Sequence, residues 1–208
     1  YYCRQYQVQD GLRNNAIQRC VDDAYGCMGF GTREGLNRFD GYTFKVYRND
    51  SEAPNSIGSN TIKTLATDQN GTLWIGTRTG LYKYNPGSDD FSSILLCQDL
   101  PIISITQGVA NDLWLISNGK ILNYNIPLDH IKTYTLPDNS NCSSICITVL
   151  GQIWLAGQNG GVYELIESTG SFSSYDLFAH STNITSRYIN CIYPTATGDK
   201  ILVGTRTH

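Results

Sequence analysis

The sequence predicts an all-β fold, a β-propeller built from four-stranded antiparallel blades, and three observations predict it. A tryptophan between apolar residues recurs at Trp74, Trp114 and Trp154. With Gly29 and Leu202 taken as the first and last members, the copies stand 45, 40, 40 and 48 residues apart, and a period of about 40–50 residues is typical of propeller blades. Short segments of strand-forming residues, separated by Gly, Asn and Asp, fill each period.

The second repeat shows the strand pattern most clearly. Asn70-Gly71 marks a turn, because both residues tolerate positive φ. The segment from Pro86 to Asp90 is rich in turn-forming residues and ends the third strand. We therefore expect four strands joined by hairpins, at 60–68, 72–77, 81–85 and 91–95. The first repeat has the same pattern, with strands expected at 15–21, 28–32, 36–40 and 43–47.

The repeats predict one continuous array over 1–208. Blades are expected at about 10–50, 56–97, 100–136 and 140–178, with a partial one at 186–208. The partial blade has strands at 188–193 and 200–205 and then the sequence ends, so we expect about four and a half blades in an incomplete or fragmentary propeller.

The edges of the first and last blades could be covered in several ways. Segment 1–9 alternates suitably to act as a closing outer strand. Otherwise we expect an open arc, an imperfect five-bladed ring, or blade edges covered by a second chain, since exposed sheet edges pair readily. The last solution predicts a homo-oligomer that forms through the exposed edges.

The repeated residues predict packing roles. Each Trp is expected to fill the wedge between neighbouring sheets. The glycines of the Gly-Thr pairs, Gly31, Gly76 and Gly204, are expected to allow close approach of neighbouring blades. Gly29 stands where the first repeat lacks its Trp, so we expect either that Met28 or a neighbouring blade fills that gap or that this blade is weakened.

Composition and charge exclude several classes. The net charge is −3, whereas a nucleic-acid surface needs a basic stripe. No apolar run is long enough to span a bilayer. Seven cysteines leave at least one unpaired or bonded to another chain, and Cys142 and Cys146, four apart on one strand, are expected to face the same way. No spacing supports a metal site, and we expect no cofactor.

The sequence offers no catalytic motif. Its three histidines, His130, His180 and His208, are scattered, and no nucleophile elbow occurs. Adjacent carboxylates such as Asp22 and Asp23 point to opposite faces of a strand, whereas acid–base chemistry needs carboxylates that converge on one substrate. We therefore expect that the chain is not an enzyme.

Two segments resemble a known family. Residues 10–17, Asp-Gly-Leu-Arg-Asn-Asn-Ala-Ile, and residues 30–41, Phe-Gly-Thr-Arg-Glu-Gly-Leu-Asn-Arg-Phe-Asp-Gly, resemble the two-component regulator propeller repeat. The first two copies match it well, the next two match loosely, and the fifth is short. This repeat is typical of the periplasmic sensor half of hybrid two-component histidine kinases in gut Bacteroidetes.

The resemblance implies a function and a location. Such repeats form seven-bladed propellers, often in tandem, followed by a small β-sandwich, a membrane helix and a kinase. It implies a periplasmic sensor of carbohydrate breakdown products that controls polysaccharide-utilisation genes. The sequence contains neither sandwich, membrane helix nor kinase motifs, so we expect a fragment of a larger sensor or a truncated member of the family.

Binding residues are expected on the turns between second and third strands, which share one face of a propeller. Arginines that follow Gly-Thr would grip a carboxylate, such as that of an acidic sugar, and amides would bond sugar hydroxyls. Tyr42, Tyr82 or Tyr163 would offer stacking faces. The candidates are Arg33, Glu34, Arg78, Asn118, Gln158, Asn159 and Arg206. Solvated turns or ion pairs between blades explain the same residues without a ligand.

Two classes of function remain open. The first is a ligand-sensing ectodomain fragment for an oligosaccharide, and the second is a structural interaction propeller without a small ligand. A propeller lyase or glycosidase is a distant third class.

Overall fold

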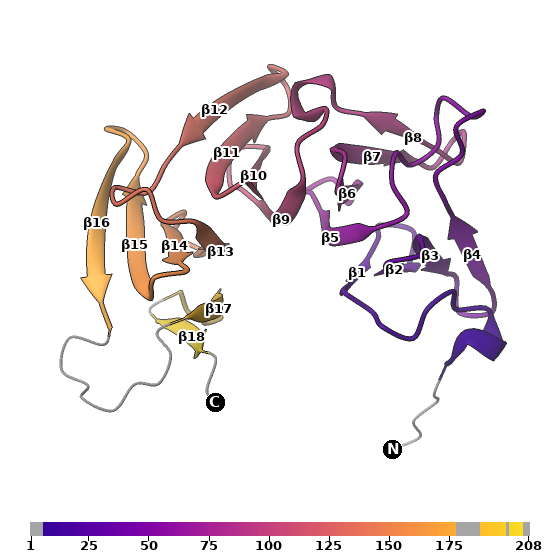
Figure 1. Ribbon diagram of the computed structural model, residues 1–208, viewed down its shortest axis with the longest axis horizontal. Coiled ribbons are helices and arrows are strands. Elements are labelled where there is room, and N and C mark those ends of the chain that lie inside the picture. The colour runs from indigo at the N-terminus through magenta and orange to yellow at the C-terminus, as the bar shows by residue number, and fades with distance from the viewer. Residues whose placement is uncertain (1–5, 178–187, 199, 206–208) are drawn as a thin grey trace. The chain divides into compact units, whose positions relative to one another are not determined.

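The protein consists of antiparallel sheets. The computed structural model describes residues 6–177, 188–198 and 200–205. The chain divides into two compact units, Tyr1–Ile105 and Thr106–His208. Each complete sheet has four strands in the order in which they follow one another in the sequence (Figure 1). The predicted all-β architecture of four-stranded antiparallel blades is confirmed.

The first unit contains two complete sheets. Sheet 1 consists of β1 Arg19–Asp22, β2 Met28–Gly31, β3 Leu36–Phe39 and β4 Phe44–Tyr47. Sheet 2 consists of β5 Ile62–Thr67, β6 Leu73–Thr77, β7 Leu81–Asn85 and β8 Asp90–Ser93. Two short 3-10 helices, η1 Val8–Asp10 and η2 Leu95–Cys97, precede sheet 1 and follow sheet 2.

The next strand, β9 Ile102–Gln107, contains the boundary between the units. It begins sheet 3, which continues with β10 Asp112–Ser117, β11 Lys120–Asn125 and β12 His130–Tyr134. Sheet 4 consists of β13 Cys142–Ile147, β14 Ile153–Gly157, β15 Gly161–Ile166 and β16 Ser171–Asp176. The last two described strands, β17 Ile189–Pro194 and β18 Ile201–Thr205, pair with each other. No helix in the described part of the chain is long and apolar enough to span a membrane.

Local hydrogen bonds move two strand boundaries from their expected places. The first strand begins at Arg19 and not at residue 15, because the Asn14 side chain accepts the Ala16 N–H at 2.7 Å and holds a turn there. The fourth strand of sheet 2 ends at Ser93 and not at residue 95, since the chain then enters η2. Of the predicted closing segment 1–9, residues 1–5 lie outside the described residues and Val8 begins η1.

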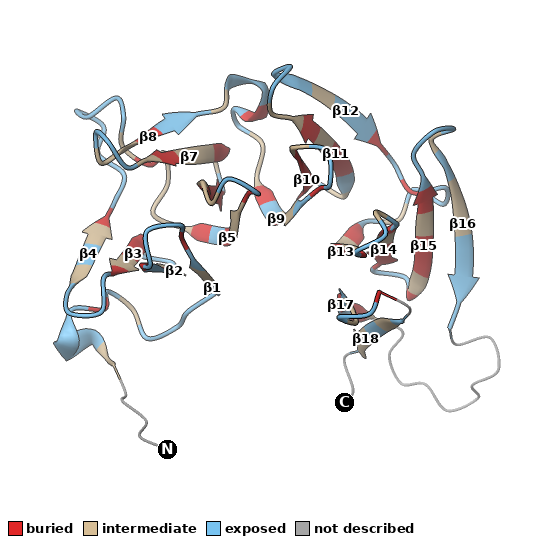
Figure 2. Ribbon diagram, turned by 180° about the vertical axis from the view of Figure 1, so that it is seen from behind, coloured by how far each residue is buried: buried red, intermediate tan, exposed pale blue. Residues whose placement is uncertain are grey.

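Neighbouring sheets bury their facing sides. In the first unit, Leu36 of sheet 1 packs with Ile62, Leu73 and Ile75 of sheet 2. In the second unit, the core between sheets 3 and 4 contains Trp114. Buried residues concentrate in the middle strands, while the outer strands β12 and β16 are largely exposed (Figure 2). Because a single sheet exposes its apolar sides, each one depends on its neighbour for stability.

The three tryptophans lie within this packing. Trp114 joins the core between sheets 3 and 4 and stacks on Tyr134, with 5.6 Å between ring centroids. Trp154 packs against the cluster that contains Ile189 of β17. Trp74 is fully buried, and its Nε1–H donates to Asp68 Oδ2 at 2.9 Å.

The Asp–Trp pair also fixes the turn before β6. Asp68 Oδ1 accepts the N–H groups of Asn70 at 2.9 Å and Thr72 at 3.0 Å. One carboxylate therefore orders a hairpin turn through one oxygen and an indole through the other. Such bonds to a charged acceptor contribute about 1.5–3 kcal/mol each.

Sheet 1 lacks the tryptophan of the other four-stranded sheets, and an arginine makes the equivalent hydrogen bond. Arg38 stands opposite Gly29 across the strands, and its Nε–H donates to Asp23 at 2.8 Å, the bond that an indole would make. Leu65 from sheet 2 lies 3.6 Å from the place of a Cβ on Gly29. Met28, which the sequence offered as a filler, is 39% exposed.

Two repeated glycines lie where neighbouring strands come close. A Cβ on Gly31 would stand 2.7 Å from Cγ2 of Ile62, and one on Gly76 would stand 2.9 Å from the main-chain oxygen of Ile102. A side chain at either place would push the next strand away. The nearest neighbour of Gly204 is Cys191, within its own sheet.

The prediction that Cys142 and Cys146 face the same way is wrong. A β-bulge between Cys142 and Ser144 shifts the alternation of side chains by one residue. Cys142 therefore joins the core between sheets 3 and 4, whereas Cys146 packs on the opposite side near Ile189. Neither Cys142 nor Cys146 forms a disulfide with another of the described residues.

Sheet 4 offers a test of the Asp–Trp pair. Thr148 stands where Asp68 stands in sheet 2, six residues before the tryptophan, and the buried Nε1 of Trp154 has no hydrogen-bond partner among the residues that the structure describes. Thr148→Asp should supply one and raise the free energy of unfolding by about 1 kcal/mol, measured by urea denaturation. In a Trp154→Phe background the gain should be clearly smaller, because only the bonds to the turn remain, and an equal gain in both backgrounds would contradict the pairing.

Candidate functional site

The sequence-predicted binding residues lie on exposed turns. In the first unit, Arg33 and Glu34 connect β2 to β3, and Arg78 connects β6 to β7. In the second unit, Asn118 connects β10 to β11, while Gln158 and Asn159 connect β14 to β15. Arg206 lies outside the described residues. The binding role of this set stays a prediction.

The turns that present the arginines share one hydrogen-bond pattern. Thr77 Oγ1 donates to Gly80 O at 3.1 Å and accepts the Thr79 N–H at 3.1 Å. Thr32 makes the equivalent bonds around Arg33. Within the described residues neither Arg33 nor Arg78 forms an ion pair, so both guanidinium groups face solvent from ordered turns.

In the second unit, Asn159 belongs to a polar cluster. Its Nδ2 group donates to Asp138 and, at 3.1 Å, to the Tyr163 hydroxyl, which itself donates to Asp138 at 2.9 Å. Burial would raise the pKa of Asp138, but hydrogen bonds from Ser140 and Tyr163 outweigh it and lower that pKa. The Asn159 amide is thus already engaged, although it lines a shallow pocket of about 220 Å³.

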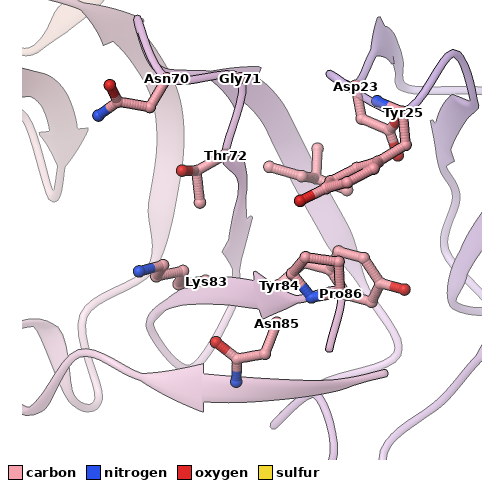
Figure 3. Close-up of a pocket in the computed structure, with 10 residues that line it drawn as sticks. Asp23, Tyr25, Asn70, Gly71, Thr72, Lys83, Tyr84, Asn85 and Pro86 are labelled. Atoms are coloured by element: carbon pink, nitrogen blue, oxygen red, sulfur yellow. The ribbon is translucent and has the colours of Figure 1, made fainter. Parts of the chain in front are cut away.

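A second pocket, here called the β6–β7 pocket, lies in the first unit at the opposite end of β6 from Arg78. Its volume is about 240 Å³. The turn before β2, the turn before β6 and the end of β7 contribute its lining (Figure 3). The lining residues are Asp23, Tyr25, Asn70, Gly71, Thr72, Leu73, Lys83, Tyr84, Asn85 and Pro86.

The pocket lies where the pairing between β6 and β7 ends and the two strands separate. Their pairing stops at Trp74 opposite Lys83, whereas β10 and β11 pair two residues further, to Asp112 opposite Asn125. In sheet 3 the Ile126 N–H then donates to Asn111 O at 3.3 Å. Pro86 occupies the place of Ile126 one repeat earlier and has no N–H to donate. The strands therefore separate in sheet 2.

Tyr25 forms an aromatic wall of the β6–β7 pocket. Asp23 Oδ1 accepts the N–H groups of Tyr25 at 2.9 Å and Cys27 at 3.0 Å, which fixes the turn. The Ala24 N–H donates to Gly71 O at 3.4 Å and joins this turn to the one before β6. Tyr25 is 63% exposed, so a fixed turn presents its ring to solvent.

Several polar groups at the pocket are uncommitted. Within the described residues, the side chains of Asn70, Thr72 and Lys83 make no hydrogen bond or ion pair. Asn85 donates through Nδ2 to Asp90 at 2.8 Å and Ser92 at 2.9 Å, which leaves its Oδ1 to accept a hydrogen bond. In Figure 3, Asn70, Thr72 and Lys83 lie on one side, and Tyr25, Tyr84 and Pro86 on the other. The described residues contain no cluster of metal ligands.

Tyr84 connects the pocket to the seam between sheets 1 and 2. Its hydroxyl donates to Asp89 Oδ1 at 2.7 Å, and the hydroxyl of Tyr47 in β4 donates to the same oxygen at 2.6 Å. Lys45 forms an ion pair with Asp89. Burial opposes ionisation of Asp89, but Lys45 and the two tyrosines outweigh it and lower its pKa to about 2. Burial, followed by the bond to Asp89, raises the pKa of Tyr47.

Sequence reasoning did not find the β6–β7 pocket. It named Tyr42, which is 91% exposed and lies outside the pocket lining, and it passed over Tyr25. The available signal was the contrast between Pro86 and Ile126 at equivalent places in two repeats.

Comparison with known families identifies the repeat. A family model named two component regulator propeller matches residues 56–79, which contain β5 and β6. The resemblance seen in the sequence is thereby confirmed, and the chain carries this repeat. A stretch of 48 residues is 48% identical to the protein named Histidine kinase P4 of Formosa agariphila and spans 23% of this chain and 4% of that kinase.

Solved structures share the fold. The extracellular domain of a protein named a one component system from B. thetaiotaomicron matches 91% of this chain and 26% of its own, with a TM-score of 0.76 and 18% identity. The extracellular domain of a hybrid two component system from the same organism matches 97% and 40%, with a TM-score of 0.59 and 16% identity.

An enzyme shares this fold too. A streptogramin B lyase matches 93% of this chain and 63% of its own, with a TM-score of 0.72 and 15% identity. The chain thus spans less than two thirds of the length of these proteins, and at such low identity each likeness shows the fold alone.

The Asp89 contacts predict a pH dependence. Because the pKa of Asp89 in the folded chain lies below its ordinary value of 3.8, its ionised form stabilises the fold above pH 4. That stability should be lost as the pH falls from about 4 to about 2. Urea denaturation of Asp89→Asn should show a shallower loss over this range than the parent and than a Glu52→Gln control. Parallel curves for parent and Asp89→Asn would contradict the assignment.

The role of Pro86 is testable by exchange of amide hydrogens. Pro86→Ile supplies an N–H that can donate to Gly71 O, the equivalent of the bond from the Ile126 N–H to Asn111 O in sheet 3. We expect the new amide at position 86 to be protected from exchange, and the reciprocal Ile126→Pro to lower protection near Asn111. Free exchange at position 86 would show that proline does not cause the strands to part.

Proposed function

We propose that this chain, which carries the two-component regulator propeller repeat, is an extracytoplasmic ligand-sensing module of a two-component signalling protein. The repeat and the extracellular domains that share its fold support this location and role. We further propose that the ligand is a carbohydrate and that it binds in the β6–β7 pocket.

The observation that carries the proposal is the composition of that pocket. It combines the exposed ring of Tyr25 with an amide, a hydroxyl and an ammonium group that have no partner within the described residues. An apolar ring face suits aromatic side chains, and sugar hydroxyls suit neutral donors and acceptors. A volume of about 240 Å³ lies below the usual range for drug-sized ligands and suits a single sugar ring.

The chemistry of the pocket favours binding over catalysis. Its only carboxylate, Asp23, is engaged by two backbone N–H groups and by Arg38, so it is poorly placed to take a proton from a substrate. The fold that this chain shares with a lyase carries no argument for the same reaction. A module that binds without reacting fits a sensor.

The contacts below the pocket suggest how occupancy reaches the rest of the first unit. Tyr84 lines the pocket and shares Asp89 with Tyr47 of sheet 1. A ligand that moves the Tyr84 ring would therefore disturb a bond between neighbouring sheets. In this proposal the seam between sheets 1 and 2 is the first element to respond.

Titration calorimetry against a panel of plant and host oligosaccharides tests the proposal. We expect one class to bind, and Tyr25→Ala to weaken its affinity about tenfold, which is the effect of losing one aromatic contact. Tyr42→Ala is the matched control, because Tyr42 is exposed on the turn between β3 and β4 and lies outside the pocket lining. A folded chain that binds no member of the panel would instead favour a structural interaction propeller.

A further inference from the structure

Lys83 provides the accessible charge of the β6–β7 pocket. Asp23 and Lys83 are the charged residues of its lining. The Asp23 side chain is 2% exposed, and Arg38 lies 2.8 Å from its Oδ2, so that carboxylate is neutralised. Within the described residues Lys83 has no ion pair. A ligand therefore meets a net positive site.

The parting of β6 and β7 brings Lys83 to the same pocket as Tyr84. Adjacent residues of a strand point to opposite faces of the sheet. Lys83 stands opposite Trp74, on the other face from Tyr84, at the last paired position before the gap. Because the strands separate there, both faces border the pocket, and Lys83 lies across from Tyr25 (Figure 3).

We infer that the β6–β7 pocket selects a sugar ring that carries an anionic group, a carboxylate or a sulfate. The ring packs on Tyr25, its anion pairs with Lys83 Nζ, and its hydroxyls reach Thr72 and Asn85. An ammonium group is a point charge without the planar fork of arginine, so it accepts either anion. This inference rests on the proposed function and names the ligand class of the same site.

The test compares charged and neutral forms of one ligand. Oligosaccharides of galacturonate and of glucuronate, their methyl esters, and a sulfated galacto-oligosaccharide are titrated into the full chain at low ionic strength. Lys83→Met removes the charge and keeps the length of the side chain, while Lys83→Arg keeps the charge. Lys63→Met is the control, because Lys63 is exposed on β5 and lies outside the pocket lining.

We expect at least one acidic ligand to bind the parent more tightly than its neutral form. Lys83→Met should weaken that ligand about two- to fivefold, the effect of one partly exposed ion pair. Affinity for the neutral form should not change, and Lys83→Arg and Lys63→Met should stay close to the parent. The uronates and the sulfated sugar then show which anion is preferred.

Two outcomes overturn the inference and separate it from the proposed function. If methyl esters bind as tightly as the acids, and Lys83→Met changes neither, the pocket binds sugars without selecting an anion and the sensor proposal stands. If no sugar of either kind binds while the chain remains folded, both proposals fail. Loss of binding in Tyr25→Ala places a bound sugar in this pocket and not elsewhere.

Discussion

The burial of apolar sheet faces against one another is the interaction on which the rest of this structure depends. The side of sheet 2 that carries Leu73 and Ile75 is covered by Leu36 of sheet 1. In the second unit, Trp114 and Leu155 join sheets 3 and 4 in the same way. Each sheet is stable because a neighbour excludes water from it, so the interior of the strands is constrained and the turns are left free to differ.

Two positions at which the sequence departs from the repeat have different structural consequences. Where sheet 1 has Gly29 in place of tryptophan, Arg38 takes over the bond to Asp23 and the packing survives. Where sheet 2 has Pro86 in place of isoleucine, nothing replaces the missing N–H, and a pocket opens. The first change is compensated within the core, whereas the second leaves a hollow lined by side chains that are free to bind. The compensated change preserves the fold, and the uncompensated one accompanies the pocket that we propose as the binding site.

The sequence could predict the fold because its signal is repeated. Residues around Trp74 set strand lengths and turns that recur in four sheets, so errors are confined to places where side chains override the pattern, such as the turn held by Asn14. The β-bulge beside Cys142 was missed because the prediction assumed strict alternation along the strand, whereas one extra residue shifts that alternation. The β6–β7 pocket was harder to predict than the fold. Arginines attract attention as ligands for carboxylates, but the pocket arises from an N–H that proline lacks and from Tyr25 on a turn.

Hydrogen exchange on the whole chain, with and without the tightest oligosaccharide of the panel, tests the central claim most directly. This claim is that ligands bind where the repeat is broken at Pro86 and not where it is regular. We predict that the ligand slows amide exchange around Tyr25, Thr72 and Lys83 and leaves the turns at Arg33 and Arg78 unchanged. Protection of those two arginine turns, with no change around the β6–β7 pocket, would contradict it.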